Sequence, residues 1–266
     1  MAQFDINNFA IDRVIRGLMV SPSTGSVMWS INQITEPTLS ITTEESEVVD
    51  AIGVPITSFN RAKRAEFSAS NSLFDLSLFA AQSGKEKEIA TSDNKVIMPS
   101  FETIVVPSTV TNPVTLKHKP TVTPSEIYKI NGDGTLGEKL VYNASAESGK
   151  FTYDDEAHTI TFPSDAEAGT KYFILYDYEA ESGVGVIGDA VNFPRSGRFI
   201  MEVLGVDVCN PDVQVHAYVE YPNAKLDANV DVLFTTEGTH PFTIKAQQQY
   251  CDSNKILYKI LIPDED

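Results

Sequence analysis

The sequence predicts a mainly β protein, an antiparallel β-sandwich or barrel with one flanking α-helix and one inserted small β segment of Ig-like or hairpin type. Most apolar segments alternate apolar and polar residues with the period of two that β-strands show, and turn residues separate them. Only residues 59–84 contain a helix pattern. At 266 residues with 42% hydrophobic content, the chain can bury a large core as one β unit or as two domains.

The N-terminal part contains three strand patterns. Residues 14–21 and 26–35 flank the turn sequence PSTG, and Val27, Trp29 and Ile31 share one face of the second segment. This arrangement predicts a β-hairpin. Residues 39–41 begin a third strand after Pro37.

Residues 59–84 combine a strand and a short helix. The first part alternates with strand period, and Ser72 and Asp75 then have the spacing of residues that accept hydrogen bonds from the free N–H groups of a helix start. The helix that follows is apolar on nearly all sides and ends at Gly84. One stripe contains Leu73, Leu76 and Ala80, and a second contains Phe74, Leu78 and Ala81. One sheet cannot cover both stripes, so we expect Phe74 and Leu78 to contact a neighbouring copy.

Charged residues before and after residue 53 form two groups of opposite sign. We expect the acidic group to lie in a loop, and a solvated loop is its simplest explanation. The alternative is a contact between this loop and the basic strand of another copy. On that alternative the candidate subunit-interface residues are Glu44, Glu45, Glu47, Arg61, Lys63 and Arg64.

The middle of the chain reads as an insertion. Residues 107–124 are rich in Pro, Thr, Val and Lys, which indicates a boundary. From residue 127 to 178 a strand pattern recurs about every ten residues between Gly- and Asp-rich turns, as in a small antiparallel sandwich. We therefore expect residues 1–119 and 180–266 to form one β core, and residues 120–179 to form an inserted lobe.

The C-terminal part returns to strand alternation. We expect strands near residues 199–203, 213–219, 230–234, 242–244 and 256–262. No second helix pattern occurs among them, so these strands complete the core begun by the N-terminal part.

The sequence contains no local signature of catalysis, so we expect no enzyme, no cofactor and no metal site. Gly183, Gly185 and Gly188 fit the spacing of a dinucleotide-binding loop, but Pro194 and Gly197 follow where a helix is required. The histidines are scattered without partners at ligand spacing. An enzyme site assembled from distant loops stays open as an alternative.

Charge and hydropathy restrict the partners. The net charge of -17 and the sequence pI near 4.6 disfavour a protein that grips nucleic acid through phosphate contacts. The N-terminus has neither a basic start nor a long apolar run, and no segment approaches the length of a membrane span. We expect a protein made in a cytoplasm and without a membrane span.

The order of these features resembles the bacteriophage major tail tube proteins. The resemblance rests on the paired N-terminal strands, the sequence GVP at residues 53–55, RAKRAE at 61–66 and FAAQSG at 79–84. The middle sequences GKFTYDDEAHTITF and GTKYFILYDY are similar to segments of phage tail proteins. The insertion at 120–179 is a departure, because many tube subunits lack one.

The resemblance implies a structural virion protein of the phage tail. In that family a β-sandwich carries one flanking helix, copies join as homohexameric rings, and the rings stack into a channel for genome delivery. Implied partners are further copies, a sheath or terminator, and a baseplate or tip, while DNA passes through the lumen without specific binding. The implied location is the virion tail, assembled in the host cytoplasm. An acidic β-sandwich binding or adhesin module of a phage or bacterial surface is the alternative.

Overall fold

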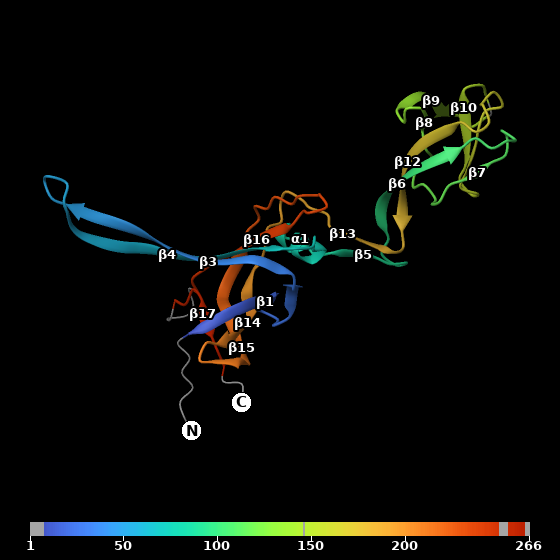
Figure 1. Cartoon of the computed structure of the whole chain (residues 1–266). Helices are drawn as coiled ribbons and strands as arrows, with labels where there is room; N and C mark the ends of the chain where they lie inside the picture. Colours follow the sequence, from blue (N-terminus) through green and yellow to red (C-terminus); the bar gives the residue numbers. More distant parts are fainter. Residues whose placement is uncertain (1–7, 146, 250–254, 264–266) are drawn as a thin grey trace. The chain divides into compact units, whose positions relative to one another are not determined.

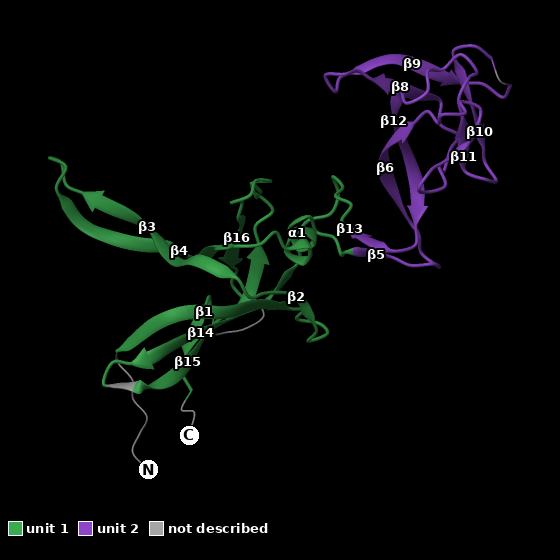
Figure 2. Ribbon diagram, turned by 45° about the vertical axis from the view of Figure 1, so that its right-hand side comes forward, with its two compact units in different colours: residues 1–87, 186–266 green, residues 88–185 purple. Residues whose placement is uncertain are grey.

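The computed structural model describes residues 8–145, 147–249 and 255–263, and it is mainly antiparallel β with one helix. The fold class predicted from the sequence is therefore confirmed. The chain divides into two compact units, of which unit 1 contains Met1–Lys87 and Val186–Asp266 and unit 2 contains Glu88–Gly185 (Figure 2). Each unit has its own hydrophobic core.

Unit 1 is built on an 8-stranded sheet with the order β2-β1-β14-β15-β16-β4-β3, and β17 pairs with β15. The two edge strands β2 and β3 are consecutive in the chain, so the sheet curls into a nearly closed barrel (Figure 1). Its strands are β1 (Phe9–Val20), β2 (Val27–Ile31), β3 (Ile34–Val49), β4 (Pro55–Asn71), β14 (Ser196–Asp207), β15 (Asn210–Leu226), β16 (His240–Ala246) and β17 (Lys259–Leu261).

Aromatic rings fill the core of unit 1. Phe67 and Phe199 stack with their ring centroids 5.8 Å apart, and Trp29 and Phe242 pack around them. Each of these rings comes from the inward positions of an alternating strand, which is why the period of two located them in the sequence. The predicted hairpin at the N-terminus is confirmed, since β1 and β2 pair with Met19 opposite Trp29.

The single helix, α1 (Leu76–Gln82), begins later than the sequence indicated. Asp75 is its N-cap, and its Oδ1 accepts a hydrogen bond of 2.8 Å from the Leu78 backbone N–H. Ser72 lies outside the helix, so its expected capping role is wrong. After the helix, Gly84 has φ +70° and lies so close to Phe193 that an added Cβ would stand 2.5 Å from the Phe193 backbone nitrogen. Both constraints favour glycine there.

Unit 2 contains a 7-stranded sheet with the order β6-β12-β8-β9-β10-β11-β7 and a two-stranded ribbon of β5 and β13. Ile127, Phe151, Ile160 and Ile174 lie fully buried in its core. Its strands are β5 (Glu88–Ala90), β6 (Val96–Val105), β7 (Val114–Thr115), β8 (Glu126–Ile130), β9 (Leu136–Tyr142), β10 (Lys150–Asp154), β11 (Thr159–Thr161), β12 (Lys171–Ala180) and β13 (Gly183–Gly185).

Unit 2 extends beyond the insertion of residues 120–179 that the sequence indicated. Strand β6 pairs with β12 along its whole length, from Val96 opposite Ala180 to Val105 opposite Lys171, and this ladder holds β6 in unit 2. In the division into two units, the Pro- and Thr-rich residues 107–124 lie inside unit 2 and contain β7.

Two C-terminal strand predictions need correction. Residues 230–234 form no strand. They follow a turn after β15 in which the Asp227 side chain accepts a hydrogen bond of 3.2 Å from the Asn229 backbone N–H. Within 256–262 only β17 forms. Gly183 and Gly185 belong to β13, which pairs with β5, and no helix follows them in the described chain.

Candidate assembly surfaces

The outer half of the β3–β4 hairpin has no core on either face. β3 and β4 pair from Ile34 opposite Asn71 to Val49 opposite Pro55. The inner part of β4 places Ala65, Phe67 and Ala69 in the core of unit 1, whereas residues 40–49 and 55–64 are exposed throughout. Figure 1 shows this outer ribbon extending away from β1, β14 and β15.

Apolar side chains line this exposed ribbon and its tip. Ile52 at the tip is 85% exposed, and the others are Val48, Val49, Val54, Ile56 and Phe59. An isolated two-stranded hairpin is marginally stable in water, and exposed apolar side chains on one mark a contact site. The ribbon therefore has the properties of an element that is completed by a partner.

The predicted acidic loop is a strand. Glu44, Glu45 and Glu47 lie on β3 because the turn comes only at residues 50–54. Glu44 lies opposite Arg61 and accepts a hydrogen bond of 3.0 Å at its Oε1 from Nη2 of Arg64. Part of the charge match expected between copies is thus formed within one hairpin.

The other charged residues of the ribbon do not form such a pair across the hairpin. Glu45 lies opposite Asn60 and Glu47 opposite Ser58, so neither carboxylate has a basic residue across the ladder. Lys63 is exposed beside Ala62, whose φ of 49° marks a bulge in the pairing. Bulges bend a strand and redirect its side chains.

Asp50 has a local role at the hairpin tip. Its Oδ1 accepts hydrogen bonds from the backbone N–H groups of Ile52, at 2.9 Å, and Val54, at 2.8 Å. Gly53 supplies the positive φ of 87° that the turn needs. The carboxylate of Asp50 is therefore used in forming the turn.

The two interface candidates from the predicted helix, Phe74 and Leu78, lie in different surroundings. Leu78 is fully buried in the core of its own unit, so its side chain is not open to another copy and we remove it from the proposed surface. Phe74 is 45% exposed. Leu73, assigned to the inward stripe, is exposed, because the helix begins only after it.

Phe74 belongs to an aromatic cluster, here called the Phe74 patch, with Phe79, Phe234 and His240. The Phe74 ring stacks on His240 at 5.3 Å and meets Phe234 at 5.7 Å. Phe234 is 81% exposed and Leu233 beside it is also exposed. The patch presents apolar surface next to α1.

His240 anchors the Phe74 patch from beneath. It is fully buried, its Nδ1 accepts a hydrogen bond of 3.3 Å from the Asp75 backbone N–H, and its Nε2 lies 2.7 Å from Oε1 of Gln82. Because Nδ1 accepts, the ring is neutral with its proton on Nε2. Burial lowers the pKa of His240 below its ordinary value, which favours this neutral form.

A second charged surface lies on the outward face of β1, β14, β15 and β17. Glu202 is nearly buried between Arg16 and His216, and the Arg16 guanidinium holds the pKa of this carboxyl below its ordinary value. On the same face Glu220 is nearly buried and receives a hydrogen bond of 2.8 Å from Nε of Arg198, with Nζ of Lys259 3.5 Å away. Two carboxylates thus lie beneath basic side chains.

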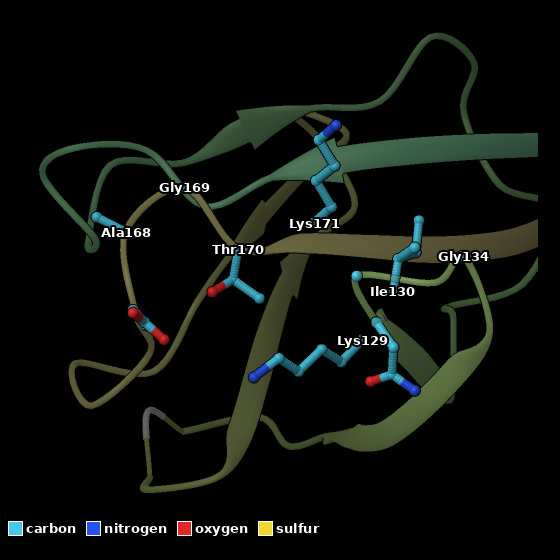
Figure 3. A pocket seen from close by; sticks show the side chains of 10 residues that line it. Lys129, Ile130, Gly134, Ala168, Gly169, Thr170 and Lys171 are labelled. Carbon is cyan, nitrogen blue, oxygen red and sulfur yellow. The ribbon is translucent and has the colours of Figure 1, made fainter.

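Unit 2 has an open hollow between the turn after β8 and the loop before β12 (Figure 3). The hollow is lined by backbone and by the side chains of Lys129, Lys171, Glu167, Asn131 and Thr170.

Within the described residues no group of three or more His, Cys, Asp or Glu could hold a metal ion. No helix in the described part of the chain is long and apolar enough to cross a membrane.

These features define a structural class: an antiparallel β-barrel protein with one flanking helix, an inserted β unit and a coreless projecting hairpin. The sequence matches the YomU/Tube protein family over residues 9–256. The chain belongs to this family of phage tail tube proteins, which confirms the resemblance seen in the sequence. No curated protein matches the chain.

Sequence reasoning missed the apolar hairpin tip and the exposed pair Leu233 and Phe234. The sequence places this pair in a strand, in which adjacent residues point to opposite faces and one would be buried. The signal that could have located the tip is the sequence AIGVPI at 51–56, where apolar residues surround a Gly-containing turn.

Proposed function

We propose that this chain is the repeating subunit of a phage tail tube, whose copies join as hexameric rings and stack into a channel for genome delivery. The observation that carries the proposal is the β3–β4 hairpin. Its outer half exposes both faces and several apolar side chains, and burying each of these gains about 1.5–3 kcal/mol. A second copy of the chain supplies that burial in a tube.

The Phe74 patch is the second surface in the proposal. Phe74 and Phe234 leave a partly bare aromatic surface beside α1, and aromatic residues are enriched where proteins contact one another. We assign to contacts between copies Phe74 from this patch and, from the hairpin, Glu44, Glu45, Glu47, Arg61, Lys63 and Arg64.

The overall charge fits passage of DNA through the tube. With 37 acidic against 20 basic residues, the net charge of -17 per subunit disfavours phosphate contacts, so DNA passes through the lumen without specific binding. The other proposed partners are the proteins at the tube ends and, where the tail is contractile, the sheath. Assembly takes place in the host cytoplasm, and the product is part of the virion.

The direct test is a variant whose hairpin is cut back. Thr42 lies opposite Arg64, so residues 43–63 can be replaced by Asn-Gly, a favoured two-residue hairpin turn. None of the removed side chains is buried, so unit 1 is expected to keep its core and its cooperative unfolding. Sedimentation is expected to show polymers from the wild type and only small species from the variant. Wild-type polymerisation by the shortened chain would contradict the proposal.

A second candidate function, an adhesin-like binding module, is favoured by one feature of unit 2. Phe101 and Leu175 are exposed opposite each other on β6 and β12, and Phe173 lies 6.1 Å from Phe101 between ring centroids. A binding module would remain monomeric at concentrations where a tube subunit polymerises, so sedimentation separates the two functions.

A further inference from the structure

We propose that the outward face of β1, β14, β15 and β17, here called the cation face, receives the Glu45 and Glu47 side of a neighbouring copy's β3–β4 hairpin. This inference rests on the proposed function, since it needs copies that assemble. It adds which surface of one subunit contacts which surface of the next.

The cation face presents positive side-chain ends to solvent. The side chains of Arg16, Arg198 and Lys259 are 58%, 49% and 38% exposed, whereas those of Glu202 and Glu220 are only 10% and 9% exposed. Cations therefore form the outer layer and carboxylates the inner one. His216 completes the layer, with its Nδ1 2.9 Å from Oε1 of Glu202.

The net charge of this cluster is positive, whereas the net charge of the whole chain is negative. Three permanent cations stand over two carboxylates, which gives 3 − 2 = +1 without counting His216, in a chain of net charge -17. Such a cluster attracts an acidic surface and disfavours other pairings, because complementary charges steer partners and fix their register.

The hairpin supplies two carboxylates suited to this cluster. Glu45 and Glu47 are two residues apart on β3, so they share one face with a spacing of about 7 Å. Their ladder partners, Asn60 and Ser58, carry no charge. Within the described chain neither Glu45 nor Glu47 forms an ion pair, whereas Glu44 is held by Arg64.

Other acids of this stretch fit the site less well. The Asp50 carboxylate already accepts hydrogen bonds from the N–H groups of Ile52 and Val54 in the turn.

On the cation face, Arg198 and Lys259 both reach Glu220 from different strands, so their charged ends lie near each other above one carboxylate. Two closely spaced acids of an incoming strand match this pair of cations.

The test exchanges the charges. The hairpin variant Glu45→Lys with Glu47→Lys and the receiver variant Lys259→Glu are each expected to raise the critical concentration for polymerisation about tenfold or more at low salt. Combining all three substitutions is expected to recover most of the loss. The control for the hairpin variant is Glu138→Lys with Glu156→Lys, which makes the same change in net charge on exposed residues of unit 2. This control is expected to polymerise as the wild type does.

A chemical measurement avoids any effect of these variants on folding. A carbodiimide joins an amine and a carboxylate only when they touch, so wild-type polymers of mixed isotope labelling should yield a cross-link between Lys259 of one copy and Glu45 or Glu47 of another. Polymers without that cross-link and with charge variants unaffected would overturn the docking and leave the proposed function standing. A wild type that never polymerises would overturn both.

Discussion

At the scale of single residues, His240 connects the core of unit 1 to the Phe74 patch. Both ring nitrogens of His240 have partners, and the ring supports Phe74 from below. Asp75 is the nearby carboxylate, at the start of α1, and it opposes the effect of burial on the pKa. The folded structure therefore favours the neutral ring over the protonated one.

This arrangement predicts a dependence of stability on pH. Burial lowers the pKa of His240 below its ordinary 6.5, so the unfolded chain takes up the proton first as the pH falls. The contribution of His240 is fully present above about pH 6.5 and is lost as the pH falls toward the lower folded pKa. Urea unfolding at pH 7.5 and 5.5 should show a larger loss for the wild type than for His240→Gln. His158→Asn is the control, and equal losses in the wild type and His240→Gln would contradict the assignment.

Phe74 and Leu78 provide a paired test of the helix. Leu78 is buried in the core, so Leu78→Asp leaves a charge in apolar surroundings and is expected to unfold unit 1. Phe74 is 45% exposed but packs on His240 and Phe234, so Phe74→Asp is expected to lower the thermal midpoint modestly, far less than Leu78→Asp, while it reduces polymerisation. Thermal unfolding and sedimentation of both variants check this, and normal polymers from Phe74→Asp would exclude the patch from assembly.

At the scale of elements, strands in which apolar and polar residues alternate can be predicted from the sequence, whereas the ends of strands and helices cannot. Phe67, Phe199 and Phe242 are predictable from the sequence because each lies in a stretch where buried residues alternate with less buried ones. Ser72 and Asp75 both fit a cap by residue type, and in the structure Asp75 is the N-cap, with its own backbone N–H donating to Nδ1 of His240.

The candidate surfaces were predictable only in part. The sequence placed Glu44 and Arg64 among contact residues but could not pair them, since their pairing depends on the register of a 17-residue strand with bulges. It placed Leu78 and Phe74 together on one stripe, although the sheet covers the first and not the second. Glu202 and Glu220 each pair with a cation from a strand not adjacent in the sequence, Arg16 on β1 and Lys259 on β17, so these clusters leave no local signal.

Gly84 is expected to be the least replaceable turn residue of α1. Gly84→Ala combines an unfavourable positive φ of 70°, costing about 1–2 kcal/mol, with a contact of 2.5 Å to the Phe193 backbone. Gly25→Ala in the β1–β2 turn is the matched control, because its φ is 71° and nothing lies within 4 Å of the added Cβ. Urea unfolding should show the larger loss of stability for Gly84→Ala, and similar losses would argue against the close approach.

At the scale of the whole molecule, we propose that unit 2 is separable from unit 1. Glu88 lies opposite Gly185 in the β5–β13 ribbon, so the chain leaves and re-enters unit 1 at neighbouring points. Replacing residues 88–185 by a short Gly-Ser turn is expected to leave unit 1 with a cooperative unfolding transition. Residues 88–185 alone should fold on their own core, as judged by dispersed amide NMR signals. A truncated unit 1 that precipitates, or an unfolded isolated unit 2, would show that the two depend on each other.

The central claim is that copies of this chain build a hollow tube. The measurement that tests it most directly is electron microscopy of the purified full chain over a range of concentrations, with rotational averaging of end-on views. The account predicts stacked rings with six-fold symmetry around an open lumen, and their loss when residues 43–63 are replaced by Asn-Gly. A chain that stays monomeric at high concentration, or that forms fibres without a lumen, would contradict it.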